Sequence, residues 1–400
     1  MPPAPTLIVP AMLDPRSTPA VKAHPKVDPL PALTSLRFLA AAYVMIYHYA
    51  PIFFPKTSEG MVVPLGYTGV TFFFLLSGFI LAYNYRGADL AAPQRRSFFY
   101  RARFARIWPT LLLGLAMHLP WLFNWASQEP EPLRSLMRSG IVLAPLGIHA
   151  WVPGAACSLD CPSWSVSAEV FFYALFPILL PLTLRDPARV GVATLAFWTA
   201  SVALCTLLWQ AYGAGVPFSA PEPGGVGPVL LAQFIKYFPV LHLPTFVAGL
   251  LLFAFWERSR WPVGFLLAGA SAFAILIVVL APVIPGPILH NGMTMAAWAP
   301  LILACAAMRR GPLCTAPMIF LGKISFALYL LHIPVFAVLN TVDRVALHGW
   351  LMGHPWVGVA VNGLVSLAAA SLVHLVVEEP ARRWILRRGA PPIRGPVATA

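Results

Sequence analysis

Charged residues are scarce in this chain of 400 amino acids, and their scarcity excludes most classes of soluble protein. Only 10% of the residues are charged and 59% are hydrophobic, with a mean hydropathy of +0.75, whereas soluble domains carry roughly 25% charged residues. The polar stretches between apolar segments, at about 20 residues, are too short for a soluble domain. We therefore predict an all-α, polytopic integral membrane protein that lies in a lipid bilayer.

Acidic residues are rarer than basic ones: 14 Asp and Glu stand against 27 Lys and Arg, which gives a formal net charge of +13. A basic chain can bind nucleic acid, but here the basic residues form short clusters between apolar segments instead of one stripe or tail. We expect no nucleic acid partner and interpret the charge as a signal of membrane orientation.

Cysteines are also few, and the five present do not form a disulfide framework. Only Cys157 and Cys161, in the stretch CSLDC, are close enough in sequence to suggest a pair. No second Cys/His pair accompanies them, which argues against zinc, and we expect no metal. A disulfide between them depends on whether their loop faces an oxidising compartment.

Long apolar runs, by contrast, recur from end to end, and we predict about ten membrane-spanning helices. Their expected ranges are 33–54, 65–85, 107–126, 164–184, 190–212, 229–255, 261–281, 289–308, 318–341 and 354–377. The shorter segment 136–150 is expected to be re-entrant or interfacial. Residues 33–385 would form the membrane domain, between a flexible, proline-rich cytosolic tail at 1–32 and a cytosolic C-terminal tail at 386–400.

The basic residues predict the orientation of these spans. Ten spans place both termini on one side, and 22 of the 27 Lys and Arg residues fall on that side. The exceptions are Lys56, Arg134, Arg138, Lys236 and Arg344. Cytoplasmic loops carry the excess of basic residues, so we expect both termini in the cytoplasm and the protein in the cytoplasmic (inner) membrane.

Two ionisable residues, Arg37 and His48, share one face of the first predicted span. Eleven residues advance a helix by about three turns, so the two side chains align with a rise of roughly 16 Å between them. Charged groups at membrane depth are costly and usually functional. Arginine can hold a phosphate and histidine can accept a proton from a hydroxyl. The alternative is an arginine that reaches the lipid phosphates and a packed, hydrogen-bonded histidine.

A second basic motif lies where the chain enters the third predicted span, in FFYRARFARIWP. Arg103 and Arg106 are three residues apart and share a helix face, an arrangement that could clamp a diphosphate. Such clusters also serve simply to set the topology. In the second span, Ser77 and Gly78 interrupt FFFLLSGF, and we interpret them as residues that allow close helix packing.

An acidic residue, Glu169, lies inside the fourth predicted span, in WSVSAEVFFY. From the topology we expect its side chain in the outer half of the protein, close to Trp164, Ser165 and Tyr173. A buried carboxylate there could orient a histidine or bind sugar hydroxyls, and Trp164 could stack on a sugar ring. A carboxylate paired with a nearby cation for packing is the alternative.

The ninth predicted span, LGKISFALYLLHIP, contains Lys323 at its cytosolic end and Tyr329 and His332 near its centre. A histidine before a helical proline is often structural, with a hydrogen bond to a freed carbonyl group, and this alternative stays open. The last span closes with VVEEPARRW, which reads as a set of charge pairs that fix a cytosolic helix end.

Taken together, these motifs resemble the membrane domain of acyltransferase family 3. The resemblance covers roughly residues 33–385 and rests on Arg37 and His48 with ten residues between them, FFFLLSGF, the cluster ending in RIWP, WSVSAEVFFY, LGKISFALYLLHIP and EEPARRW. Two departures are that Ala102 precedes Arg103 where adjacent arginines are common, and that Ala168 precedes Glu169 where the motif often reads WSLSVE.

The resemblance implies transfer of an acyl group, most often acetyl, from cytosolic acyl-CoA to a hydroxyl of a carbohydrate or related acceptor at the extracytoplasmic side. The expected donor-binding residues are Arg37, Arg103, Arg106 and Lys323. The expected catalytic residues are His48, as general base or transient acyl carrier, Glu169, which would orient His48 or the acceptor, and Arg37. The expected acceptor-binding residues are Trp164, Ser165, Tyr173, Tyr329 and His332.

A transporter or flippase of a lipid-linked sugar is the competing hypothesis, in which His and Glu residues would relay protons. It predicts two internally similar halves, and no such repeat is found in the sequence. A third alternative is a non-catalytic membrane protein whose polar residues only hold helices together.

Overall fold

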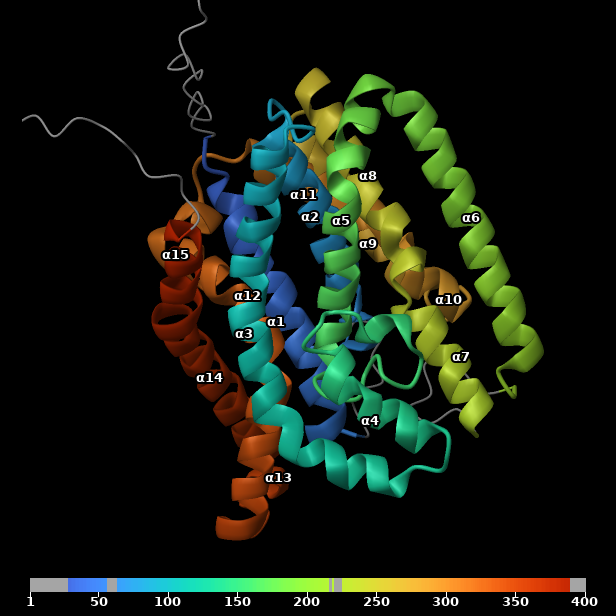
Figure 1. Cartoon of the computed structure of the whole chain (residues 1–400), viewed down its shortest axis with the longest axis vertical. Coiled ribbons are helices and arrows are strands. Elements are labelled where there is room, and N and C mark those ends of the chain that lie inside the picture. The colour runs from blue at the N-terminus through green and yellow to red at the C-terminus, as the bar shows by residue number, and fades with distance from the viewer. Residues whose placement is uncertain (1–27, 56–62, 216–217, 219–224, 389–400) are drawn as a thin grey trace, which may run out of the picture.

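The computed structural model describes residues 28–55, 63–215, 218 and 225–388, which form helices and contain no strand. The long helices pack side by side in one bundle (Figure 1). The α-helices are α1 (Pro31–Phe53), α2 (Thr68–Tyr85), α3 (Pro93–Gln128), α4 (Leu133–Leu143), α5 (Trp164–Arg185), α6 (Pro187–Tyr212), α7 (Val226–Tyr237), α8 (Pro239–Arg258), α9 (Val263–Leu280), α10 (Gly286–Ile288), α11 (Met295–Ala307), α12 (Ala316–Ala346), α13 (Trp350–Gly353), α14 (Pro355–Val373) and α15 (Glu379–Arg387).

Six short 3₁₀ or π segments complete the described part of the chain. They are η1 (Val63–Leu65), η2 (His149–Trp151), η3 (Cys161–Ser163), η4 (Leu289–Met293), η5 (Pro312–Cys314) and η6 (His374–Glu378). The tails expected at 1–32 and 386–400 lie mostly outside the described residues, which begin at residue 28 and end at residue 388.

The all-α membrane fold predicted from the sequence is confirmed. Nine stretches of helix in the described residues are long and apolar enough to cross a bilayer. The expected span 107–126 is helical too, within α3, but Pro109, His118, Pro120 and Asn124 make it less apolar than the others. The expected span 229–255 is divided at Pro239 into α7 and α8, since proline has no N–H to continue the helix.

The segment 136–150 does not cross the bundle, as expected for a re-entrant or interfacial segment. It begins inside α4, which has only 11 residues, and continues into a loop that packs against α5 (Figure 1). Small residues of this loop, Ala150, Ala155 and Ala156, are almost completely buried. The loop therefore lies within the protein, where backbone polar groups can find partners away from lipid.

Close contacts between small residues hold the centre of the bundle together. Gly78 of α2 and Gly249 of α8 face each other, and a Cβ atom added to either would lie 2.1 Å from a backbone oxygen of the opposite helix. A Cβ on Gly322 of α12 would lie 2.0 Å from the carbonyl oxygen of Thr34 in α1. These glycines let helix backbones approach closely, as the interpretation of Ser77 and Gly78 anticipated.

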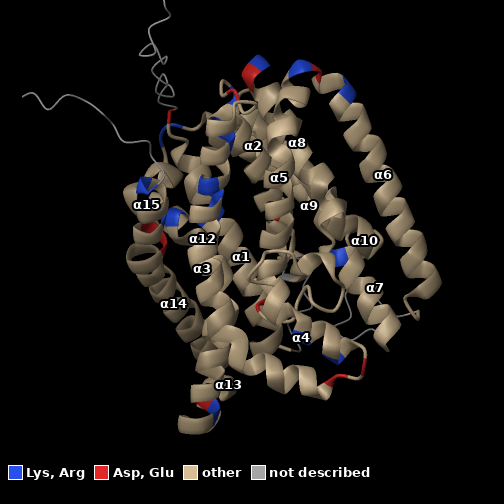
Figure 2. Ribbon diagram, viewed as in Figure 1, with Lys and Arg blue, Asp and Glu red and all other residues tan. Residues whose placement is uncertain are grey.

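Basic residues gather at one end of the bundle (Figure 2). Arg86 follows α2, Arg185 and Arg189 flank the junction of α5 and α6, and Arg258 and Arg260 lie at the end of α8. We call this the basic end. Helix α1 begins and α15 ends at the same end of the bundle (Figure 1).

Candidate active site

A cavity of about 130 Å³ lies between α1, α2, α3, α5 and α12. Arg37 from the second turn of α1, Arg103 and Arg106 from α3, and Glu169 from α5 all line it. Four residues selected from three sequence motifs therefore meet at one site, which we call the arginine cavity. Three guanidinium groups and one carboxylate leave it with an excess of positive charge, suited to an anionic ligand.

Aromatic rings hold two of the arginines in place. The Arg103 guanidinium lies 6.0 Å from the ring centroid of Phe99 and 5.8 Å from that of Tyr173. The Arg106 guanidinium lies 5.3 Å from the ring centroid of Phe326. Cation–π contacts orient these side chains without neutralising them. Tyr173 and Glu169 both line the cavity.

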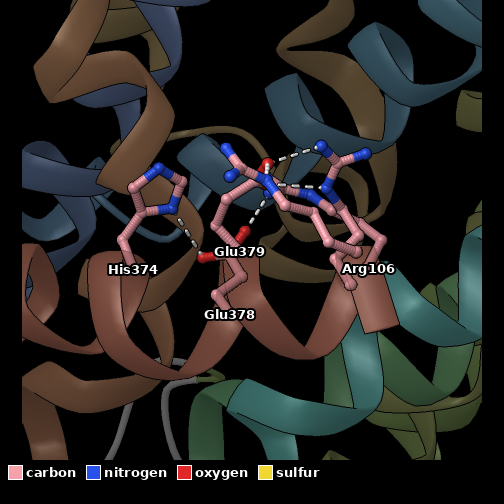
Figure 3. A network of polar contacts seen from close by, with 6 residues as sticks. Arg106, His374, Glu378 and Glu379 are labelled. Carbon is pink, nitrogen blue, oxygen red and sulfur yellow. Dashed lines mark hydrogen bonds and ion pairs between the residues drawn. The ribbon is translucent and has the colours of Figure 1, made fainter. Parts of the chain in front are cut away.

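Arg106 has a partner that the sequence motifs did not identify. Its Nη1 pairs with Oε1 of Glu378, whose other oxygen, Oε2, lies 3.2 Å from Nδ1 of His374 (Figure 3). Glu378 is 1% exposed in its side chain, whereas Arg106 is 24% exposed. Both acid and histidine belong to η6, a π-helical segment, a form that is frequent at functional sites.

The neighbouring acid, Glu379, plays the part that the sequence suggested for the whole motif. It pairs with Arg382 at 2.8 Å and with Arg383 at 2.7 Å, both within α15. The interpretation of VVEEPARRW as charge pairs at a helix end is therefore correct for Glu379. Glu378 instead ties the last helix to α3 and orients an arginine of the cavity, a role that only the fold brings about.

Two hydroxyl groups of the predicted acceptor site also line the arginine cavity. Ser165 Oγ and Tyr329 Oη are 2.9 Å apart, and each is 2.9 Å from the carbonyl oxygen of Pro162. This triangle joins the start of α5 to the middle of α12. It places Tyr329 at the wall of the cavity, one helical turn before His332.

His48 lies outside the lining of the arginine cavity, farther along α1, and meets His332 there. Nε2 of His332 is 3.1 Å from Nδ1 of His48. The Tyr329 and His332 rings are 6.2 Å apart between centroids. The chain of contacts from Tyr329 to His332 to His48 therefore links the arginine cavity to the histidine that the sequence selected as the base.

Glu169 lies among the arginines of the cavity. Its side chain lines the cavity with Arg37 and Arg103, and its expected position in the outer half, where it would orient His48 or the acceptor, remains a prediction. The side chain that contacts His48 is His332.

Trp164 and Lys323 also lie away from the cavity wall. Trp164 is 6% exposed, and its ring packs 5.0 Å from those of Tyr237 and His242 between centroids. Lys323 is exposed in the third turn of α12. Trp164 belongs to an aromatic cluster near the start of α5, and Lys323 belongs to the surface, so their expected binding roles remain predictions.

The loop before α5 is pinned by a disulfide between Cys157 and Cys161. The Asp160 side chain between them is buried, and burial raises its pKa well above the usual value. Burial lowers the pKa of His149 in the same loop to about 4. The His149 ring is therefore neutral near pH 7, and burial favours the protonated form of Asp160. Across the ranges that the structure describes, no group of three or more His, Cys, Asp or Glu residues is placed to hold a metal ion.

Comparison with known proteins identifies the chain as an acyltransferase. The family model described as an acyltransferase domain, Acyl_transf_3, matches residues 30–375. The acyltransferase MdmB of Streptomyces mycarofaciens is 30% identical over 396 residues, which are 94% of this chain and 96% of that protein. Nodulation protein 10 of Rhizobium leguminosarum bv. viciae is 26% identical over 331 residues, 79% of this chain and 82% of that protein.

A further relative is named for its activity. The O-acetyltransferase OatA of Staphylococcus aureus is 23% identical over 352 residues, which are 78% of this chain and 51% of that protein. No solved structure matches the chain. The family match covers every helix from which the arginine cavity and the His48–His332 contact are built, namely α1, α2, α3, α5 and α12. The chain therefore belongs to acyltransferase family 3 and is a multi-pass membrane enzyme that transfers acyl groups.

Proposed function

We propose that this enzyme transfers an acetyl group from cytosolic acetyl-CoA to a hydroxyl of a carbohydrate or related acceptor at the extracytoplasmic side of the inner membrane. The observation that carries the proposal is the meeting of Arg37, Arg103 and Arg106 in one cavity, together with the presence of His48 on the same helix as Arg37. The basic end would face the cytoplasm, in line with the positive-inside rule. The name of the relative OatA supports acetyl as the group and oxygen as its acceptor.

The arginine cavity suits the donor because CoA carries a diphosphate and a further phosphate. Guanidinium groups bind phosphate with paired, charge-assisted hydrogen bonds. Arg37 and Arg103 would hold the phosphates, and Glu378 would keep Arg106 oriented beside them while neutralising part of its charge. The thioester arm would then extend along α1, whose rise of roughly 16 Å between Arg37 and His48 is comparable to the length of that arm.

His48 would act on the acceptor hydroxyl. It would take the hydroxyl proton while the oxygen attacks the thioester carbonyl carbon; the carbon–sulfur bond breaks and the leaving sulfur recovers the proton. The negative charge of Glu169 would attract Arg37 and Arg103 and keep their side chains at the cavity. Trp164 would stack on a sugar ring. An acetyl group that stays on the protein after the donor is removed would indicate an acyl-histidine route instead.

Purified protein in lipid nanodiscs, supplied with acetyl-CoA, tests this function through the release of the CoA thiol. We expect release by the wild type and its loss in Arg37→Ala and His48→Ala. Arg101→Ala is the matched control, because Arg101 belongs to the same motif but lies outside the lining of the cavity. Full activity of both Arg37→Ala and His48→Ala in folded protein would rule the mechanism out.

A further inference from the structure

Two imidazole rings from distant parts of the chain meet in the middle of the bundle. His48 of α1 and His332 of α12 have ring centroids 5.0 Å apart, with 44° between the ring planes. Nε2 of His332 lies 3.1 Å from Nδ1 of His48. The two residues are 284 positions apart in the sequence, so only the fold brings this pair together.

The backbone determines which nitrogen of each ring carries the proton. Nδ1 of His48 lies 2.9 Å from the carbonyl oxygen of Val44, and Nδ1 of His332 lies 3.2 Å from that of Leu328. A carbonyl oxygen only accepts hydrogen bonds, so each Nδ1 must carry a hydrogen in the neutral ring. Nε2 is then the unprotonated nitrogen in both rings.

This proton placement gives the contact between the rings a direction. The Nδ1–H of His48 is shared between the oxygen of Val44 and the lone pair on Nε2 of His332. Nε2 of His48 keeps its own lone pair and makes no hydrogen bond to any residue that the structure describes. His48 is partly exposed, whereas His332 is 0% exposed and has contacts at both nitrogens. Only His48 can therefore meet a substrate.

We propose that His332 is a positioning residue that fixes His48 in its Nδ1–H form and so reserves Nε2 of His48 as the base for acyl transfer. The inference rests on the proposed function, because it assigns an atom and a supporting residue to the base of that reaction. His332 occupies the place that a carboxylate holds in a hydrolase triad, where a third group orients the histidine.

In this reaction His48 carries one proton from the acceptor hydroxyl to the leaving sulfur. The acceptor hydroxyl gives its proton to Nε2 of His48 while its oxygen bonds to the thioester carbon, and the departing sulfur takes that proton as the carbon–sulfur bond breaks. In between, His48 is positively charged, and its Nδ1–H bond to Nε2 of His332 becomes a stronger, charge-assisted bond. His332 stays neutral throughout, so the buried pair carries at most one charge.

The surroundings hold His332 firmly enough for this role. The hydroxyl of Tyr49, next to His48 in α1, donates to the backbone oxygen of His332 at 2.7 Å and lies 3.0 Å from Oγ of Ser366. Tyr49 is 1% exposed and Ser366 is 0% exposed. This buried bridge fixes the separation of α1 and α12 at the level of the two rings.

The test uses three variants of the full chain in nanodiscs with acetyl-CoA as the probe, and thiol release to water or an added polyol as the readout. His332→Gln offers an amide that can accept from Nδ1–H of His48 and donate to the oxygen of Leu328. His332→Leu removes both contacts. His118→Leu is the matched control, a buried histidine of α3 whose ring nitrogens have no hydrogen-bond partner among the described residues.

We expect His332→Leu to lower kcat by about 10- to 100-fold, a share of the 10²- to 10⁴-fold effect of general-base catalysis. The KM for acetyl-CoA should change by no more than about twofold, because the arginine cavity binds the donor elsewhere. His332→Gln should keep most of the kcat, and His118→Leu should match the wild type. Equal losses in the Gln and Leu variants, or wild-type kcat in His332→Leu, would overturn the inference.

Two further results separate this inference from the proposed function. If His48→Ala abolishes turnover while His332→Leu retains it, the positioning role alone fails. If the wild type releases no thiol, the proposed function fails and the inference with it. In wild-type protein with ¹⁵N-labelled histidine rings, the signal that is lost in His48→Ala should report a neutral ring protonated at Nδ1. Protonation at Nε2 would overturn the inference whatever the variants do.

Discussion

Ionisable residues inside the bundle of this enzyme have partners that reduce the free-energy cost of burying them. Arg106 and Glu378 pair with each other, His48 and His332 share a hydrogen bond, and Arg103 lies against aromatic rings. The sequence motifs identified the arginines and the histidines, because ionisable residues stand out in apolar segments. They did not identify their partners, since Glu378 and Arg106 are 272 positions apart.

Glu378 should matter far more for stability than its neighbour Glu379. Glu378→Gln leaves the charge of Arg106 without its partner, and loss of one member of a buried pair costs roughly 3–5 kcal/mol. Because the Arg106 side chain is 24% exposed, we expect the lower end of this range. Glu379→Gln should cost less than about 1 kcal/mol, since its partners Arg382 and Arg383 are well exposed. Thermal unfolding in detergent measures both, and equal losses would contradict the assignment.

Asp160 should destabilise the protein near neutral pH. Burial raises its pKa in the folded state, so the folded form binds a proton that the unfolded form releases above the ordinary carboxyl pKa. The contribution of Asp160 to the free energy of unfolding is therefore highest at low pH, where its carboxyl is protonated in both states, and falls as the pH rises toward the folded-state pKa. Asp160→Asn removes this loss and should raise the unfolding temperature at pH 7 by about 1–3 °C.

The exposed Asp89 of the α2–α3 loop is the control for this pH effect. Asp89→Asn should leave the unfolding temperature unchanged at pH 5 and at pH 7. The gain from Asp160→Asn should shrink as the pH is lowered from 7 to 5. A gain that is the same at both pH values, or a loss at pH 7, would show that Asp160 does not carry its proton in the folded protein.

At the scale of helices, the sequence predicted where the membrane-spanning helices lie along the chain, but it did not predict the breaks within them. The apolar runs around 33–54 and 65–85 correspond to α1 and α2 within a few residues, because helices are obligatory where lipid offers no hydrogen bonds. The division at Pro239 and the π-helical segments η4 and η6 were not predicted. These breaks depend on contacts between helices, which hydropathy along one segment does not contain.

The crossing of α2 and α8 should tolerate no larger residue at its closest point. A Cβ on Gly249 would lie 2.1 Å from the carbonyl oxygen of Leu75, so Gly249→Ala must push the helices apart, at a cost of about 1–3 kcal/mol. Gly269 of α9 has open space around its Cα, and Gly269→Ala should be neutral or stabilise the helix by roughly 0.5–1 kcal/mol. The unfolding temperature of purified Gly249→Ala should fall, and that of Gly269→Ala should stay the same or rise. Equal changes in the two variants would contradict the close packing of α2 and α8.

At the scale of the whole molecule, the charged residues are distributed unevenly between the two ends of the bundle, in line with a proposed reaction whose donor comes from one side only. Basic residues mark one end of the bundle (Figure 2), and the arginine cavity gathers three of them beside Glu169. From this cavity, contacts run through Tyr329 and His332 to His48. The sequence predicted this axis from the spacing of Arg37 and His48 on one helix. It could not predict that a second histidine, instead of Glu169, would contact the base.

The most direct test of this account is the side of the membrane from which the donor is used. Acetyl-CoA does not cross lipid bilayers, so its thiol release can be compared in sealed inverted and right-side-out vesicles from cells that produce the wild type or His48→Ala. We predict release from inverted wild-type vesicles, release from right-side-out vesicles only after permeabilisation, and none with His48→Ala. Equal release from intact vesicles of both orientations, or full release with His48→Ala, would contradict a donor site at the basic end that serves His48.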